Sequence, residues 1–297
     1  MTLLKEIEGL YARQLSNWSL AHDNYTAVAQ APERVFSHHG RTLVARLLPC
    51  RHRSATAEAG DEEAKRCFLC AAQQPPEQEA ITLGNRLRIQ VNPYPIFTRH
   101  LTVSAVDHRP QAIVPHIEQM MDVAALMPGY VLFYNGPRCG ASAPRHLHFQ
   151  AVPFAELPLC RETIDNDADL SCYFPFLYII RKSKNEALRW FHILQDGMTR
   201  LHGDKSEPMQ NVFCHRTAGQ WHIIIVPRAK HRPACYGTGP EQFLISPAAV
   251  EMGGMWPIVR EEDFKRVKPE LLYNIGDEVG ITEDEKDFLI DYFSQNV

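Results

Sequence analysis

Residues 145–150 read Arg145-His146-Leu147-His148-Phe149-Gln150, an alternation of polar and apolar side chains. In a β-strand, successive side chains point to opposite faces of the sheet. The two histidines and the glutamine would therefore share one face, while Leu147 and Phe149 pack behind them. The pattern predicts a strand that holds two imidazoles and a carboxamide side by side on a rigid element.

A loop rich in small residues precedes this strand. It runs from Asn135 to Ser142 with the sequence Asn-Gly-Pro-Arg-Cys-Gly-Ala-Ser. Little side-chain bulk surrounds its backbone amides, so they could approach an anion closely. Such a loop feeding a strand of alternating histidines suggests phosphoryl or nucleotidyl chemistry with a histidine nucleophile. The alternative is a half-buried strand whose histidines are satisfied by hydrogen bonds. Because this spacing occurs together with the loop, we favour phosphoryl or nucleotidyl chemistry over the purely structural strand.

The composition is ample for a sizeable core, in one large domain or two small ones. The chain has 297 residues, of which 45% are hydrophobic and 22% charged, and a formal net charge of −4. This mildly acidic balance gives no electrostatic footprint for nucleic-acid binding. No apolar run approaches the ~20 residues of a membrane span, and the N-terminal residues lack the apolar segment of a signal peptide. We therefore expect a cytoplasmic protein that binds neither nucleic acid nor membrane.

Eight cysteines are spread thinly over the chain, unlike a disulfide framework. In a reducing cytosol, close cysteine pairs indicate metal or redox sites. Cys67 and Cys70 have the two-residue gap that lets both thiolates reach one zinc ion. A tetrahedral site needs two more ligands, and the chain offers His108 and His146. A redox dithiol or two buried cysteines are the alternatives, although the two prolines at 75–76 make a thioredoxin-like helix less attractive.

Periodicity predicts an α+β fold in which helices cover antiparallel sheets. The pattern of the first half partly recurs after Pro153, so the two halves look like diverged copies of one unit. The predicted strands are residues 86–92, 100–105, 129–134, 146–152, 172–180, 211–215, 221–226 and 243–246. The predicted helices are residues 2–21, 111–126 and 182–201. The polar stretch at 54–66 is predicted to be an exposed loop or a short helix.

Three polar residues of the first half carry alternative predictions. Asn92 ends a strand where a base-and-ribose pocket could form, and its other role would be to cap a turn. His100 opens an apolar strand and is predicted to be a hydrogen-bonded core histidine rather than a catalyst. Arg145 could neutralise a phosphate or could be a solvated surface charge.

The residues around His148 resemble a known signature. His146-Leu-His148-Phe-Gln150 is similar to the His-x-His-x-Gln signature of the transferase branch of the histidine-triad (HIT) superfamily. That branch includes galactose-1-phosphate uridylyltransferase, diadenosine tetraphosphate phosphorylase and plant GDP-galactose phosphorylase. The loop at 135–142 resembles the stretch before the signature in the diadenosine tetraphosphate enzymes. Asn92-Pro-Tyr-Pro, followed by the strand from His100, resembles the family's ribose-binding asparagine and the strand after it.

The resemblance implies a role for each matching residue. His148 would be the nucleophile, and Gln150 would donate an amide hydrogen bond to a non-bridging phosphate oxygen. The implied substrate-binding residues are Asn92, Asn135, Gly140, Ala141, Ser142 and Arg145. The implied ligands of a structural zinc ion are Cys67, Cys70, His108 and His146, which match the zinc ligands of the uridylyltransferases in order and context. The chain departs from the diadenosine tetraphosphate enzymes by one extra residue between Ser142 and His146.

The resemblance also implies a HIT-like fold with two diverged HIT-like halves. Residues 1–160 would be the catalytic half, and residues 161–297 a degenerate second half without a His-x-His pair. The implied function is a nucleotidyltransferase or nucleotide phosphorylase that acts through a covalent nucleotidyl-histidine, most like diadenosine tetraphosphate phosphorylase. Its partners would be a nucleotide and a phosphate or sugar-phosphate acceptor, and homodimers are common in the superfamily. The alternatives are a nucleotide-sugar phosphorylase or hexose-1-phosphate uridylyltransferase, a non-catalytic nucleotide-binding protein, and a zinc-stabilised interaction domain.

Overall fold

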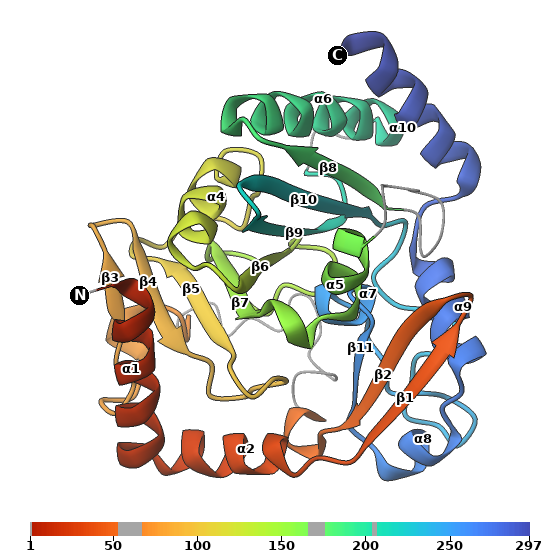
Figure 1. The fold of residues 1–297 in the computed structure, drawn as a ribbon. Helices are drawn as coiled ribbons and strands as arrows, with labels where there is room; N and C mark the ends of the chain where they lie inside the picture. Colours follow the sequence, from red (N-terminus) through yellow and green to blue (C-terminus); the bar gives the residue numbers. More distant parts are fainter. Residues whose placement is uncertain (1, 53–66, 166–175, 204–206) are drawn as a thin grey trace.

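An eight-stranded antiparallel sheet in the order β3-β4-β5-β7-β6-β9-β10-β8 is the largest feature of the computed structural model (Figure 1), which describes residues 2–52, 67–165, 176–203 and 207–297. β6 pairs with β9, so strands of the first and second halves join into one continuous sheet. The strands are β3 (Ile81–Leu83), β4 (Leu87–Val91), β5 (Leu101–Ala105), β6 (Tyr130–Asn135), β7 (His148–Pro153), β8 (Leu177–Arg181), β9 (Gln210–Thr217) and β10 (Gln220–Pro227).

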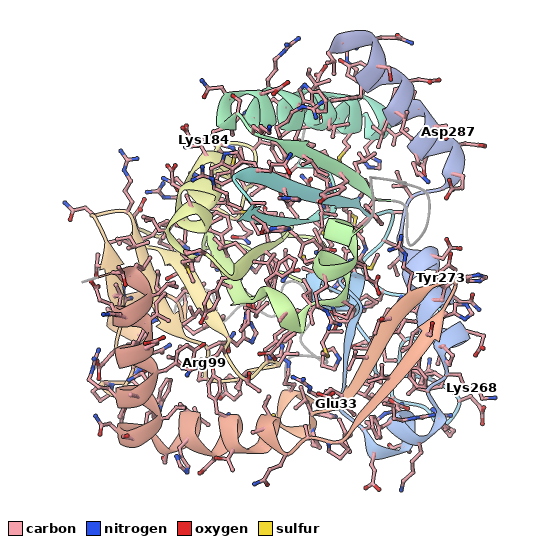
Figure 2. All side chains as sticks on the ribbon, viewed as in Figure 1. Glu33, Arg99, Lys184, Lys268, Tyr273 and Asp287 are labelled. Carbon is pink, nitrogen blue, oxygen red and sulfur yellow. The ribbon has the colours of Figure 1, made fainter. Side chains whose placement is uncertain are left out.

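Four helices cover one face of this sheet and share its main hydrophobic core. Leu147 and Phe149 are fully buried in that core, as the alternation predicted. Lys184 ties two of the helices together, because its ammonium lies 3.0 Å from Glu118 and 2.5 Å from Asp122 (Figure 2). The four helices are α1 (Leu3–Asn17), α4 (Ile117–Leu126), α6 (Lys184–His202) and α10 (Glu283–Asn296).

A second, three-stranded sheet in the order β1-β2-β11 lies beside the opposite face. β11 of the second half runs parallel to β2 of the first, so both halves also contribute to this sheet. Its strands are β1 (Glu33–His38), β2 (Arg41–Leu47) and β11 (Met255–Ile258). The remaining helices are α2 (Ser19–Ala29), α5 (Pro158–Asp165), α7 (Ala249–Met252), α8 (Glu261–Arg266) and α9 (Pro269–Val279). Within the described ranges, every helix is too short or too polar to cross a membrane.

The helix predicted at 111–126 begins later than expected, at Ile117. Pro115 disfavours helical backbone in the residue before it. The N–H of Ile113 donates to the Glu207 carboxylate at 2.6 Å, and thus to a partner far away in the sequence. Residues 111–116 therefore form a connection, which leaves the side chain of Gln111 available for another role.

The strand predicted at 243–246 is wrong. Phe243 makes only an isolated bridge with Tyr236, and the N–H of Leu244 donates to the Asp263 carboxylate at 3.0 Å. The backbone N–H of Leu244 is thus bonded to a side chain and cannot donate to a neighbouring strand. The strand predicted at 146–152 begins two residues later, at His148. The predicted loop at 54–66, and residues 172–175 of a predicted strand, lie outside the described residues.

The strands predicted at 211–215 and 221–226 are confirmed as β9 and β10, which pair antiparallel in a hairpin. Ala218 and Gly219 both have positive φ, as a two-residue turn of type I′ requires. Across this hairpin His215 pairs with His222, and their rings stack at 4.4 Å with an interplanar angle of 11°. Both residues are buried, and burial together with the neighbouring ring lowers the pKa of His215 to about 3. The pair is therefore held in the neutral form.

This histidine pair predicts a loss of stability in acid. His215 titrates near 6.5 when unfolded and near 3 when folded, so the unfolded state binds its proton first as the pH falls. The contribution is intact above pH 6.5 and is lost between pH 6.5 and 3, by about 2 kcal/mol at pH 5. We expect His215→Gln to flatten the pH dependence of the free energy of unfolding, measured by urea titration. An equal slope in parent and variant would contradict this, and His22→Gln on an exposed helix face is the control.

Candidate active site

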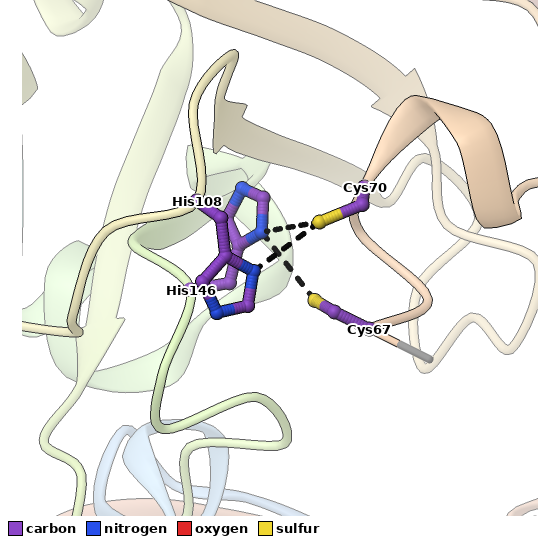
Figure 3. Close-up of side chains that lie close together, drawn as sticks. All are labelled: Cys67, Cys70, His108 and His146. Carbon is purple, nitrogen blue, oxygen red and sulfur yellow. Dashed lines mark hydrogen bonds between the residues drawn. The ribbon is translucent and has the colours of Figure 1, made fainter. Parts of the chain in front are cut away.

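Four potential metal ligands lie together where the Cys67–Cys70 turn faces two histidines (Figure 3). The Sγ of Cys70 lies 3.2 Å from His108 Nδ1 and 3.6 Å from His146 Nδ1. The Sγ of Cys67 lies 3.4 Å from His146 Nδ1. Metal–ligand bonds of the usual zinc lengths in a tetrahedron would separate a sulfur and a nitrogen by about 3.5 Å. The four ligand atoms all lie within 4.8 Å of one another, so the predicted set can hold a metal ion.

The tautomer of His146 supports this metal site. Its Nε2 lies 2.9 Å from the carbonyl oxygen of Ala105, which can only accept, so Nε2 carries the proton. The lone pair of Nδ1 therefore faces the cysteines. A histidine ligand that donates its other ring N–H to a carbonyl is the usual arrangement in metal sites. Two thiolates and two imidazoles oriented in this way fit a tetrahedral metal ion.

His148 lies at the start of β7, and only one of its two ring nitrogens makes a hydrogen bond to the described residues. Its Nδ1 donates to the carbonyl of His146 at 2.8 Å, so the lone pair is on Nε2. Nε2 is buried and has no hydrogen-bond partner among the described residues. Burial lowers the pKa of His148 to about 4. The side chain is therefore a neutral imidazole whose Nε2 can act as a nucleophile.

Gln111 fixes the backbone of His148, a role that the sequence analysis did not predict. The Oε1 of Gln111 accepts from the N–H of His148 at 2.8 Å. Its Nε2 donates to the carbonyl of His148 and to that of Asn135, both at 3.0 Å. One buried carboxamide thus joins the start of the histidine strand to the start of the small-residue loop. No local pattern marks Gln111, which the periodicity placed at the start of a helix.

Gln150 lies two residues further along β7, with its Oε1 at 2.7 Å from His100 Nε2. His100 is fully buried, and its Nδ1 accepts from the N–H of Ile96 at 3.1 Å. The prediction of a hydrogen-bonded core histidine is thus confirmed. Burial, together with the positive charge of Arg51, lowers the pKa of His100 to about 3, so this ring too is neutral.

The small-residue loop packs against the second half of the chain. Gly140 has a φ of +99°, and a Cβ there would lie 2.4 Å from the Cβ of Ala248, so only glycine fits. The side chain of Asn135 is buried, and its Oδ1 accepts from Asn211 Nδ2 at 2.9 Å and from the N–H of Ala249 at 2.8 Å. The predicted substrate-binding asparagine therefore also positions the second half against the loop.

Three of the other predicted substrate-binding residues stand in or directly after the loop, and Asn92 follows β4. Ala141 is half-buried, whereas Ser142 and Arg145 are exposed. The Oδ1 of Asn92 accepts from the N–H of Tyr94 at 2.9 Å, which is the turn-capping role weighed above. Arg51 was not predicted, although it opens a basic run in the sequence. Its guanidinium donates to the carbonyl of Tyr94, and its charge acts on His100, which places a cation near this buried histidine.

Comparisons with known proteins identify the fold. Residues 10–153 match a family model described as a domain of unknown function (DUF4922). No curated protein matches the chain in sequence. Among solved structures, yeast Ap4A phosphorylase Apa2 in complex with AMP matches with a TM-score of 0.57 and 16% sequence identity, over 91% of this chain and 97% of that chain. The same enzyme in complex with Ap4A matches with a TM-score of 0.53 and 17% identity, over 89% and 97%. The chain therefore has the fold of yeast Ap4A phosphorylase, and the predicted α+β fold with antiparallel sheets is confirmed.

Proposed function

We propose that this protein is a nucleotidyltransferase of the phosphorylase type, which forms a covalent nucleotidyl-His148. The observation that carries the proposal is the bare, buried Nε2 of a neutral His148 on the strand that follows a glycine-containing loop. This nitrogen is unprotonated because of the ring's tautomer and not only because it is buried. The only N–H of the neutral ring, on Nδ1, donates to the carbonyl of His146. The shared fold with yeast Ap4A phosphorylase supports the same class of activity.

The reaction proceeds by two displacements at one phosphorus atom. First, the lone pair of His148 Nε2 attacks the α-phosphorus, a P–N bond forms, and the P–O bond to the leaving phosphate group breaks. The carbonyl of His146 stabilises the imidazolium character that develops, through the Nδ1–H bond. Second, an oxygen of the acceptor attacks the same phosphorus, the P–N bond breaks, and neutral His148 is restored. We infer that the acceptor is inorganic phosphate or a sugar phosphate.

The residues around the nucleophile receive the roles that the family resemblance implied. Backbone amides of Gly140 and Ser142 bind phosphate oxygens, while the N–H of Ala141 between them donates to the carbonyl of Gly136 at 3.3 Å. Gln150 donates an amide hydrogen bond to a non-bridging oxygen. Asn92 binds the ribose, and Arg145 neutralises phosphate charge. Residues 1–160 carry this chemistry, while residues 161–297 support the loop through contacts such as Asn211 to Asn135.

We propose zinc as the metal of the Cys67, Cys70, His108 and His146 cluster. The mixed sulfur and nitrogen donor set matches the ligand preference of Zn²⁺. All four positions of the tetrahedron are filled by protein, so zinc supplies a structural cross-link when bound. The ligand His146 also provides the carbonyl that orients His148, so the cross-link holds the nucleophile in place.

Intact-mass spectrometry after brief mixing with a donor tests the proposal. The panel comprises diadenosine tetraphosphate, ADP, GDP-hexose and UDP-glucose, without acceptor and without an acid quench, because phosphohistidine is acid-labile. We expect the mass of one nucleoside monophosphate to be added, which also names the base. Proteolysis at alkaline pH should place the adduct on the peptide that contains His148. Folded, metal-loaded protein that forms no adduct with any donor would favour a nucleotide-binding protein without turnover.

A further inference from the structure

The carboxamide of Gln150 has two ends of opposite polarity and nearly identical shape. Its Oε1 can only accept hydrogen bonds, while its Nε2 can only donate them. Phosphate oxygens need a donor, so one orientation stabilises charge in the transition state and the other repels it. Rotation by half a turn about the last side-chain bond exchanges the two ends at little steric cost. Something outside Gln150 must therefore choose its orientation.

His100, the residue directly before β5, determines this orientation. A backbone N–H can only donate, so the contact of 3.1 Å from the N–H of Ile96 requires a lone pair on His100 Nδ1. In a neutral imidazole the single proton is then on Nε2. This Nε2–H lies 2.7 Å from the Oε1 of Gln150 and donates to it. The Nε2 amide group of Gln150 is consequently turned away from His100.

The backbone of residues 96–100, which carries both His100 and the N–H of Ile96, is held from several sides. The hydroxyl of Tyr25 donates to the carbonyl of His100 at 2.7 Å. The guanidinium of Arg46 donates to the carbonyl of Ile96. This bond fixes the residue whose N–H donates to His100 Nδ1. The carboxylate of Glu156 accepts from the N–H and the hydroxyl of Thr98, at 3.2 and 2.6 Å. The loop that sets the tautomer of His100 is therefore anchored to β2, to the segment after β7 and, through Tyr25, to α2.

We propose that His100 is a positioning residue that locks the Gln150 carboxamide with its amide N–H groups toward the phosphate. The proposal rests on the proposed function, because it assigns Gln150 a phosphate as its target. The lock needs no charge on His100. It requires only the backbone N–H of Ile96, which fixes the imidazole tautomer and thereby the polarity of the carboxamide. His100 touches neither the substrate nor the reacting atoms, and it acts through Gln150 alone.

Two substitutions of His100 separate this role from a merely structural one. His100→Leu keeps the bulk but removes the donor, so Gln150 can rotate. We expect the rate of nucleotidyl-His148 formation to fall about 10²-fold, in kcat rather than in KM, because the lost bond strengthens in the transition state. His100→Gln retains one acceptor and one donor, and should restore the rate to within about tenfold of the parent.

A double-mutant cycle with Gln150→Ala is the decisive kinetic test. In the Gln150→Ala background, the donor of His100 has nothing left to orient, so adding His100→Leu should change the rate less than about twofold. The best donor of the nucleotide panel is the probe, and thermal melts confirm that each variant folds. Equal losses from His100→Leu in both backgrounds would overturn the proposal, because a structural defect would act independently of Gln150.

Nitrogen-15 NMR of labelled histidine tests the lock without any turnover. We expect the signals of His100 to report a neutral ring with Nε2–H, and the side-chain amide signals of Gln150 to shift in His100→Leu. An Nδ1–H tautomer or a charged ring would overturn the lock. If the parent forms no nucleotide adduct, the proposed function fails, while the tautomer still supports or overturns the lock by itself.

Discussion

Replacing His148 with alanine is expected to lower nucleotide turnover by about 10⁴-fold or more, because the variant has no atom that can form the P–N bond. The loss should be in kcat, since the variant keeps the residues that we propose bind the donor, which are the 135–142 loop, Gln150 and Asn92. The fold should survive, because Gln111 binds the backbone of residue 148 rather than its ring. Phosphorolysis of the best panel donor measures the rate, and a thermal melt measures the stability.

His215 offers a matched control for this variant. It too is a buried strand histidine whose Nε2 has no partner among the described residues, yet the small-residue loop does not precede it. His215→Ala should therefore retain turnover at neutral pH. Turnover that survives in His148→Ala would show direct transfer to the acceptor. The stereochemistry at phosphorus gives a second reading, since two displacements retain the configuration of a chiral phosphorothioate donor and a single displacement inverts it.

Features of the fold that depend on local period could be predicted from the sequence. The alternation at 146–150 predicts that Leu147 and Phe149 are buried, and both are, although Leu147 directly precedes β7. The alternation of side chains between the two faces of extended backbone is a local property that the sequence shows directly. Cys67 and Cys70 are likewise close in sequence, and the resemblance to uridylyltransferases supported the distant pair His108 and His146 that the chain offered as further ligands. Spacing alone left three interpretations of the cysteines open.

Contacts between distant segments could not be predicted. Gln111 reaches the backbone of His148 37 residues away, and the Oδ1 of Asn135 accepts from the N–H of Ala249, 114 residues away. A single carboxamide has no period, so its partner is decided by tertiary packing. Tertiary contacts also explain why the strand prediction at 243–246 is wrong, since the carboxylate of Asp263 accepts from the N–H of Leu244. The sequence therefore carries no signal for Gln111, although this residue positions the backbone of His148.

Replacing both cysteines with serine, in Cys67→Ser/Cys70→Ser, is expected to abolish metal binding and to destabilise the fold. At a free metal concentration 1,000-fold above Kd, binding to the native state contributes about 4 kcal/mol, which would be about 8 °C in melting temperature for a chain of this length. The hydroxyl of serine is a poor ligand for a borderline-soft ion such as Zn²⁺. With two of the four ligands removed, tetrahedral coordination by the protein is lost. Metal content by mass spectrometry and thermal melts with and without chelator measure both effects.

The same variant should lose nucleotide turnover even where it remains folded. The free Cys67–Cys70 turn would no longer hold His146, and the carbonyl of His146 is the acceptor that keeps the proton on His148 Nδ1. Release of this residue would let the other tautomer place a proton on Nε2, which then cannot attack phosphorus. Cys235→Ser, a half-buried cysteine outside the cluster, is the matched control and should keep metal, stability and turnover. A double variant that loses its metal but keeps full turnover would separate the cluster from the orientation of His148.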